Sequence, residues 1–358
     1  AASDVYKRQV VAGFAGASAV AAGSGLDGVE INAGQFSLIR QFLSGLTNQR
    51  GDGYGAERTR LLDEVLAAVR AALDGGILGL RLSGDEMAPW AGITPEQAAE
   101  LADRVADAVD YLVVERGSIY SLWATRPDGH TPPGFNLDLT RQIRAAVGDR
   151  TVLVAQGSIV DPEMAAAALD EGLCDAVEMT RAQIADPDLG AKVASGNAGR
   201  VRPCLLCNQR CSVRDARNPI VSCTVEPASG WEGRVAPELE AAPPAHPDPV
   251  LVVGAGPAGL EAARVAAGRG HPVAVRERSP HLGGAVNAAA LLPGMDRLPR
   301  FVAWLEAECR AADVSITTSD PVDAVAVESH RGPVLLCTGS SAPPSELPRG
   351  PVPVADGR

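Results

Sequence analysis

Four cysteines within one short stretch are the residues of this chain best suited to bind a metal centre. They are spaced as Cys204-x2-Cys207-x3-Cys211-x11-Cys223. Thiolates are soft ligands, and cysteines this close together on one loop can wrap around a small polynuclear centre. Structural zinc sites more often show two separated Cys-x2-Cys pairs. The spacing therefore favours an iron–sulfur cluster, and structural zinc stays open as the alternative.

A glycine-rich turn further along the chain is suited to bind phosphate. The glycines of Gly254-Ala-Gly256-Pro-Ala-Gly259 follow an apolar strand and precede an alanine-rich helix. They permit a tight turn and the close approach of a pyrophosphate to the helix N-terminus. The next predicted strand ends in Glu277, eighteen residues after Gly259, where an acid can bind ribose hydroxyls. This context predicts a dinucleotide site, and a glycine turn without ligand is the alternative.

Polar residues also gather where five predicted strands end. They are Asn32, Arg81, Glu115 with Arg116, Gln156 with Gly157, and Thr180 with Arg181. Carboxyl ends of parallel strands meet at one edge, which is where barrel enzymes keep their active sites. The residues after the last two strands, Gly157-Ser158 and Thr180-Arg181, resemble a phosphate site.

The elements that must position these residues alternate between strand and helix. Apolar runs predict strands, and amphipathic segments between them predict helices; one begins at Thr94-Pro-Glu-Gln97, which has the pattern of a capping box. The predicted strands are Gly28–Asn32, Ile77–Leu82, Tyr111–Glu115, Thr151–Ala155 and Asp175–Met179. Such alternation predicts parallel strands with right-handed crossovers. Five units cannot close an eight-stranded barrel, so we expect a TIM barrel that lacks its first three strands, in a chain that begins within a domain.

The predicted fold class is α/β, in four parts. Residues 1–200 form the C-terminal part of a barrel, and residues 201–230 form the cysteine segment. Residues 231–249 contain five prolines and are predicted to be a linker. Residues 250–358 begin a second, partial Rossmann-like unit.

Charge, cysteine count and hydrophobic patterning restrict the binding partners and the cellular compartment of the protein. The chain has 44 acidic and 32 basic residues, a net charge of −12, so a general role in nucleic-acid binding is excluded. Seven cysteines, an odd count, suit a metal site in a reducing compartment. The Ala/Gly-rich run Val10–Gly25 mimics a secretory signal but continues into a strand, which favours a helix followed by a strand. No apolar stretch reaches the roughly 18–20 residues of a membrane span. We therefore expect a cytoplasmic protein.

Several motifs taken together resemble the old yellow enzyme and 2,4-dienoyl-CoA reductase group of flavin oxidoreductases. They include Asp27-Gly-Val-Glu-Ile31, Asn48-x-Arg50-x-Asp52-x-Tyr54-Gly55 and Ile184-Ala-Asp-Pro187. The segments 179–184 and 202–209 are most similar to the mycofactocin-associated branch of that group. The resemblance covers nearly the whole chain. It implies a barrel, a four-cysteine segment and then an FAD/NAD(P) module.

The resemblance also implies cofactors and the residues that hold them. FMN would lie at the barrel rim with Arg81 near the flavin ring, its phosphate held by Gly157, Ser158, Thr180 and Arg181. Cys204, Cys207, Cys211 and Cys223 would ligate a 4Fe–4S cluster. FAD would be held by Gly254, Gly256, Gly259 and Glu277, with help from Arg278 and Gly284. Electrons would move between NAD(P)H, FAD, the cluster and FMN.

The substrate residues depart from the family pattern. Ordinary members follow the Val-Glu-Ile strand with a histidine, a histidine or asparagine, and a tyrosine, where this chain has Asn32, Gln35 and Ser37. Asn32 and Gln35 can still donate hydrogen bonds to a substrate carbonyl or to flavin, but serine is a poor proton donor beside tyrosine. No catalytic residue is therefore assigned. An enoate, an amine or an alcohol stays open as the small-molecule substrate, and a redox peptide or electron-transfer protein stays open as a partner.

One alternative comes from another functional class. The same cysteines and glycine turn would suit a zinc-stapled nucleotide-binding or redox-sensor protein without turnover. Flavin content and iron content distinguish the two hypotheses.

Overall fold

The chain forms two compact units in a computed structural model that describes residues 4–212, 217, 219–239 and 244–340. The first unit comprises residues 1–127 and 131–180, and the second comprises residues 128–130 and 181–358. The cysteine segment therefore belongs to the same compact unit as the predicted dinucleotide module. The domain bounds drawn from the sequence, with the barrel extending to residue 200, stay a prediction.

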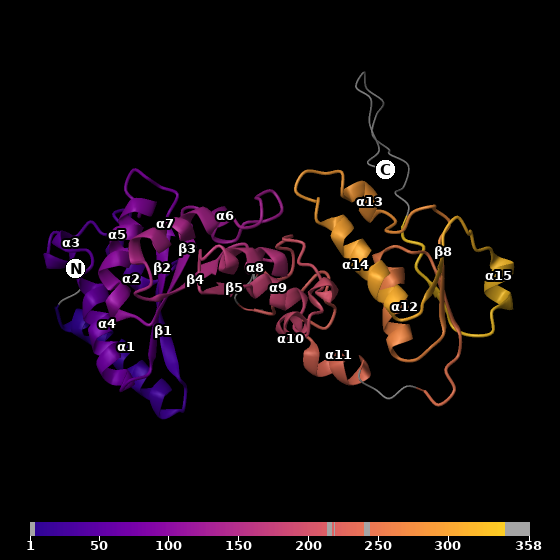
Figure 1. Cartoon of the computed structure of the whole chain (residues 1–358), viewed down its shortest axis with the longest axis horizontal. Helices are drawn as coiled ribbons and strands as arrows, with labels where there is room; N and C mark the ends of the chain where they lie inside the picture. Colours follow the sequence, from indigo (N-terminus) through magenta and orange to yellow (C-terminus); the bar gives the residue numbers. More distant parts are fainter. Residues whose placement is uncertain (1–3, 213–216, 218, 240–243, 341–358) are drawn as a thin grey trace, which may run out of the picture. The chain divides into compact units, whose positions relative to one another are not determined.

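A five-stranded parallel sheet forms the centre of the first unit (Figure 1). Its strands follow the chain order β1-β2-β3-β4-β5. Every strand predicted in this part of the sequence is present, which confirms the parallel α/β prediction. The strands are β1 (Gly28–Ala33), β2 (Ile77–Asp85), β3 (Tyr111–Arg116), β4 (Val152–Gln156) and β5 (Ala176–Glu178).

Helices bury one face of this sheet. Leu78, Leu80 and Leu82 of β2 are fully buried in the core between sheet and helices. The predicted N-terminal helix before β1 is present, and Thr94 caps α5 with the expected reciprocal bonds to Gln97. The helices are α1 (Asp4–Gly23), α2 (Leu38–Leu43), α3 (Gly53–Ala56), α4 (Arg60–Leu73), α5 (Pro95–Val105), α6 (Leu122–Thr125), α7 (Leu137–Val147) and α8 (Pro162–Asp170), with the 3-10 turn η1 (Ala106–Ala108).

The opposite face of the sheet is polar and curls inward. Strands β2 and β5 are three positions apart, which on a flat sheet would separate them by about 14 Å. Yet Arg81 Nη2 on β2 donates to Glu178 Oε2 on β5 at 2.7 Å. Likewise Tyr111 of β3 reaches Glu30 of β1 at 3.2 Å. Contacts across so many strands indicate that the sheet curves around this face, as a barrel does.

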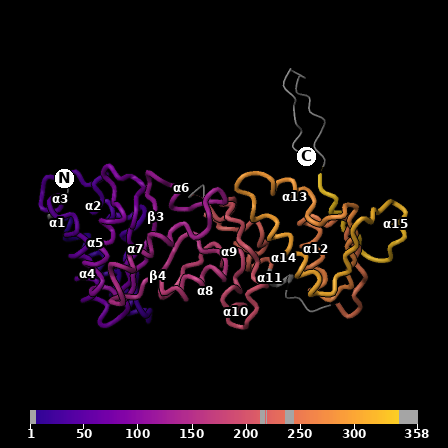
Figure 2. Tube along the Cα trace, turned by 45° about the horizontal axis from the view of Figure 1, so that its top comes forward, coloured from indigo at the N-terminus to yellow at the C-terminus, as the bar shows by residue number. Residues whose placement is uncertain are grey.

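The second unit contains a parallel sheet in the order β8-β7-β6-β9. Strands β6 (Val250–Val253), β7 (Val273–Arg276) and β9 (Val334–Leu336) lie where the sequence places apolar runs, whereas β8 (Ser315–Thr317) was not predicted. Helices α12 (Pro257–Gly268) and α14 (Leu298–Ala311) pack side by side (Figures 1 and 2). The other helices are α9 (Thr180–Ala185), α10 (Leu189–Ala194), α11 (Glu232–Leu239), α13 (Val286–Ala289) and α15 (Ala324–Ser329), with η2 (Ala198–Arg200).

Two expectations change at the element level. The proline-rich linker is not wholly irregular, because α11 occupies Glu232–Leu239. Thr180 and Arg181 begin α9 rather than end a strand, since β5 stops at Glu178. Among the described residues, no helix combines the length and the apolar sequence that crossing a membrane requires.

Candidate functional site

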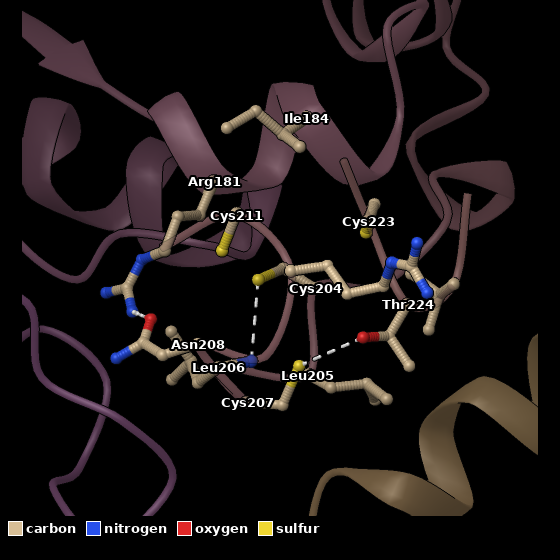
Figure 3. A pocket seen from close by; sticks show the side chains of 12 residues that line it. Arg181, Ile184, Cys204, Leu205, Leu206, Cys207, Asn208, Cys211, Cys223 and Thr224 are labelled. Atoms are coloured by element: carbon tan, nitrogen blue, oxygen red, sulfur yellow. Dashed lines mark hydrogen bonds between the residues drawn. The ribbon is translucent and has the colours of Figure 1, made fainter. Parts of the chain in front are cut away.

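The four predicted ligand cysteines line a single cavity in the second unit (Figure 3). All four are free thiols, so no disulfide competes for them. The Leu206 amide lies 3.4 Å from Cys204 Sγ, and Cys207 Sγ lies 3.6 Å from Thr224 Oγ1. The structure thus brings the four predicted ligands to one cavity, and their binding of a metal stays a prediction.

The loop geometry explains how a cysteine distant in sequence joins the other three. The Ser222 amide donates to the Arg210 carbonyl at 3.2 Å, and Arg210 Nε donates to Ser222 Oγ at 3.1 Å. Because Arg210 precedes Cys211 and Ser222 precedes Cys223, this double pairing closes the long loop. It returns Cys223 to the neighbourhood of the other thiols.

Burial and charge act in opposite directions on these thiols. Burial raises the pKa of Cys204 to about 11 and also raises the pKa of Cys211, while the nearby Arg181 guanidinium lowers both. Arg181 Nη1 donates to Asn208 Oδ1 at 2.8 Å. The side chain of Arg181 lines the cysteine cavity, and the FMN-phosphate contact expected for it from the sequence stays a prediction.

The cysteine segment packs firmly on the dinucleotide module. Arg297, at the start of α14, is buried and donates from Nε to the Cys204 carbonyl at 2.8 Å. Arg202 is also buried, lies 3.5 Å from Glu261 of α12 and stacks 4.4 Å from the Trp304 ring. These contacts explain why the two parts form one compact unit.

The donor set fits an iron–sulfur centre. Four thiols converge, and the remaining described lining consists of aliphatic, arginine, asparagine and threonine side chains, without a carboxylate. Soft ligands in such surroundings select iron–sulfur clusters or zinc over hard cations. Among the residues that the structure describes, no group of three or more His, Cys, Asp or Glu side chains, these thiols included, is arranged to hold a metal ion, so ligation by the four cysteines stays a prediction.

The glycine turn has the geometry of a phosphate-binding turn. Gly254 has φ +103°, and a Cβ on Gly259 would overlap the Gly254 carbonyl oxygen. In contrast, a Cβ on Gly256, at the N-terminus of α12, would meet no described atom within 4 Å. Open space at a helix N-terminus suits a pyrophosphate.

The acid predicted for the ribose lies beside this turn. Glu277 is buried, and its Oε2 accepts a hydrogen bond from the Ala255 amide at 2.7 Å. Gly284, with φ +53°, would bring a Cβ within 3.5 Å of the Gly256 Cα. The structure thus gathers Gly254, Gly256, Gly259, Glu277 and Gly284 in one place. Arg278 follows on the surface, and its role stays a prediction.

The predicted flavin arginine of the first unit lies among carboxylates on the inner face of the sheet. Arg81 Nε donates to Glu30 Oε1 at 2.7 Å, its Nη2 binds Glu178, and its Nη1 lies 3.8 Å from Glu115 Oε2. Burial raises the pKa of Glu115. Two of the three guanidinium nitrogens are thus fixed, and Nη1 retains donor capacity.

Two predicted phosphate residues of the first unit lie at the end of β4. Gly157 has φ +75°, and its carbonyl accepts from the Asn136 amide at 2.9 Å. Ser158 is buried, and its Oγ has no hydrogen-bond partner among the described residues. A buried hydroxyl without a partner is costly unless a ligand supplies one, which fits a phosphate.

The two predicted substrate residues lie at the carboxyl end of β1. Asn32 is exposed, and its Oδ1 accepts from the Gly34 amide at 2.8 Å. Gln35 donates from its backbone amide to Glu115 and from Nε2 to the Arg116 carbonyl at 3.1 Å. Gln35 therefore ties the first loop to β3, and its contact with a substrate stays a prediction.

Comparisons with known proteins agree with these sites. Residues 2–199 match the NADH:flavin oxidoreductase / NADH oxidase family, and that match covers more than half of the chain. The chain belongs to this family. The match assigns the curled sheet of the first unit to the TIM-barrel fold of these flavoenzymes. Residues 249–310 match the FAD dependent oxidoreductase family.

Individual relatives of this family member extend over both units. The chain is 35% identical over 353 residues to a metal reductase of Desulforamulus reducens, covering 96% of this chain and 52% of that protein. It is 36% identical over 335 residues to an N,N-dimethylglycine/sarcosine dehydrogenase of Chromohalobacter salexigens, covering 90% and 48%. The chain thus spans about half the length of the curated relatives it matches.

Solved structures of flavoenzymes are also similar to nearly the whole chain and are about twice its length. A 2-naphthoyl-CoA reductase has a TM-score of 0.88 at 28% identity, covering 95% of this chain and 52% of that one. Histamine dehydrogenase from Rhizobium sp. 4-9 has a TM-score of 0.86 at 26% identity, covering 97% and 51%.

Sequence reasoning missed the carboxylates around Arg81. Glu30 and Glu178 are its direct partners, yet neither was singled out. A signal was available, because residues two apart on a strand share one face, so Glu30 shares the face of Asn32. The pairing of Asn32 with Arg81 across β1 and β2 then places Glu30 within reach of Arg81.

Proposed function

We propose that this chain belongs to an oxidoreductase that moves electrons between NAD(P)H, FAD, a 4Fe–4S cluster and FMN. The observation that carries the proposal is the convergence of four free cysteines on one cavity in a member of a flavin oxidoreductase family. When bound, the two flavins would supply hydride transfer and the cluster would supply single-electron transfer.

Separate groups of residues in this chain would bind the separate cofactors. Cys204, Cys207, Cys211 and Cys223 would ligate the cluster. The turn from Gly254 to Gly259 and the α12 N-terminus would hold the FAD pyrophosphate, with Glu277 near the ribose. Arg297 and Arg202 hold the cysteine loop on the FAD module, which would fix the distance between the two carriers. In the first unit, Arg81 and Ser158 would hold FMN.

The substrate would bind at the carboxyl edge of the sheet, near Asn32 and Gln35. The named relatives include a metal reductase, a cinnamate reductase and a dimethylamine dehydrogenase, so enoate and amine substrates both have precedent. Asn32 presents an amide that can donate to a substrate carbonyl. Because the family tyrosine is replaced by Ser37, we propose that the proton does not come from this position.

Anaerobic purification of the full-length protein tests the proposal. We expect flavin absorption bands together with a broad absorption that dithionite bleaches, and both FMN and FAD on extraction. A colourless protein with one zinc per chain would support the zinc-stapled sensor instead.

A matched pair of glycine variants tests the FAD site alone. Gly259→Ala introduces a Cβ that overlaps the Gly254 carbonyl, whereas Gly268→Ala in the same helix meets nothing within 4 Å. We expect Gly259→Ala to raise the dissociation constant for FAD at least tenfold while FMN binding is unchanged. Gly268→Ala should bind both flavins as the wild type does. Retention of FAD by Gly259→Ala would refute the assigned turn.

A further inference from the structure

The cavity lined by the four cysteines is positively charged in an acidic protein. The described residues that line it include Arg181 and Arg210 and no carboxylate, although the whole chain has a net charge of −12. A cluster held by four thiolates is an anion, and reduction by one electron adds a further negative charge. Cations beside it therefore stabilise the reduced form more than the oxidised form.

Arg181 is held at this cavity by the loop that carries two of the thiols. Its Nη1 donates to Asn208 Oδ1 at 2.8 Å, and Asn208 directly follows Cys207. Asn208 has a left-handed backbone with φ +48°, which is uncommon for a residue other than glycine and turns the loop sharply after Cys207. Arg181 is half-buried, whereas Arg210 is exposed, so solvent screens the charge of Arg181 less.

Arg210 is held on the other strand of the same loop. Its Nε donates to Ser222 Oγ at 3.1 Å, and its carbonyl accepts from the Ser222 amide. This pair lies next to Cys211 and Cys223 in sequence. The two arginines therefore reach the cavity from different segments, α9 and the cysteine loop.

We propose that Arg181 and Arg210 set the reduction potential of a 4Fe–4S cluster in this cavity, with Arg181 the stronger of the two. The inference rests on the proposed function, because it requires a cluster on these cysteines. Both residues act through charge, so a lysine at position 181 should largely substitute for the arginine. This role is separate from the FMN-phosphate contact that the family resemblance implies for Arg181.

A redox titration of the full-length protein tests this directly. Dithionite supplies the electron under anaerobic conditions, and electron paramagnetic resonance follows the reduced cluster. We expect Arg181→Gln to lower the equilibrium constant for reduction about tenfold, a fall of about 59 mV for one electron, and Arg210→Gln to lower it less. Arg181→Lys should stay near the wild-type value.

Arg200→Gln is the matched control. Arg200 binds Glu308 at 2.9 and 2.8 Å and does not line the cavity, so its loss should leave the potential unchanged. Wild-type potentials in both Arg181→Gln and Arg210→Gln, with iron intact, would overturn the inference. If Arg181→Gln does not retain iron, the reduction potentials of Arg210→Gln and Arg181→Lys test the inference in its place.

Two further outcomes distinguish failure of this inference from failure of the proposed function. A wild-type protein without iron would refute the proposed function itself. Loss of FMN from Arg181→Gln with an unchanged cluster potential would support the phosphate role and overturn the tuning role.

Discussion

The arginines on the inner face of the first unit's sheet and those in the cysteine cavity of the second unit have different surroundings. On the sheet, Arg81 is bracketed by Glu30 and Glu178, with Glu115 close by. In the cavity, Arg181 and Arg210 form the lining together with the four cysteines, and the described lining contains no carboxylate. Arg81 is thus paired with acids, whereas Asn208 and Ser222, the described side-chain partners of Arg181 and Arg210, are neutral. We therefore expect geometry to matter most at the sheet site and charge to matter most at the cavity.

The largest effect is expected from removing one thiol. Cys207→Ser in the full-length protein should abolish the cluster, because serine is a poor ligand for iron, while FMN stays bound in the first unit. Iron quantitation and flavin extraction measure both. Cys174→Ala, at a buried cysteine of the first unit, is the control and should keep its iron. Unchanged iron in Cys207→Ser would refute the ligand assignment.

A lysine substitution at Arg81 tests whether geometry or charge decides FMN binding at the sheet. Lysine keeps the charge but loses the fork that binds Glu30 and Glu178 together. We expect Arg81→Lys to weaken FMN by roughly 1.5–3 kcal/mol, the range for hydrogen bonds to charged groups. FMN titration of the apoprotein measures this. If Arg81→Lys bound FMN with wild-type affinity, the charge of Arg81 alone would be sufficient for FMN binding. The sheet site would then not differ from the cysteine cavity in depending on geometry.

The buried hydroxyl at the end of β4 offers a smaller and cleaner test. Ser158 Oγ has no described protein partner, so its removal should cost the fold little. Ser158→Ala should weaken FMN by about 1.5 kcal/mol, roughly tenfold in Kd, through loss of the phosphate contact. The melting temperature of the apoprotein should not fall, because the hydroxyl that is removed has no described partner in the fold. A lower melting temperature with unchanged FMN affinity would assign Ser158 to the fold instead.

The smallest effect concerns pH. Burial raises the pKa of Glu115, so the folded protein holds this proton more tightly than the unfolded chain does. The resulting stability is present below the unfolded pKa of this carboxyl and is lost as pH rises through its folded pKa. Glu115→Gln should remove this loss, and urea unfolding across that pH range measures it. An identical pH dependence in Glu115→Gln would contradict the assignment.

The sequence was sufficient to predict the parallel sheets, the N-terminal helix and the cap of α5, because each depends on a local pattern: apolar runs, an Ala/Gly-rich run before a strand and a capping box at Thr94. The return of Cys223 to the other cysteines depends in addition on the pairing of Arg210 with Ser222. The position of Arg181 could not be predicted, because its partner Asn208 lies 27 residues away. Nor could the docking of the cysteine segment on α12 and α14, which depends on long-range contacts of the buried Arg202 and Arg297.

We propose that the cysteine cavity of the second unit holds an iron–sulfur cluster. Quantitation of iron, acid-labile sulfide and zinc in the anaerobically purified full-length protein tests it most directly. We expect four irons and four sulfides per chain, the content of one 4Fe–4S cluster, and no zinc. One zinc per chain without labile sulfide would contradict it.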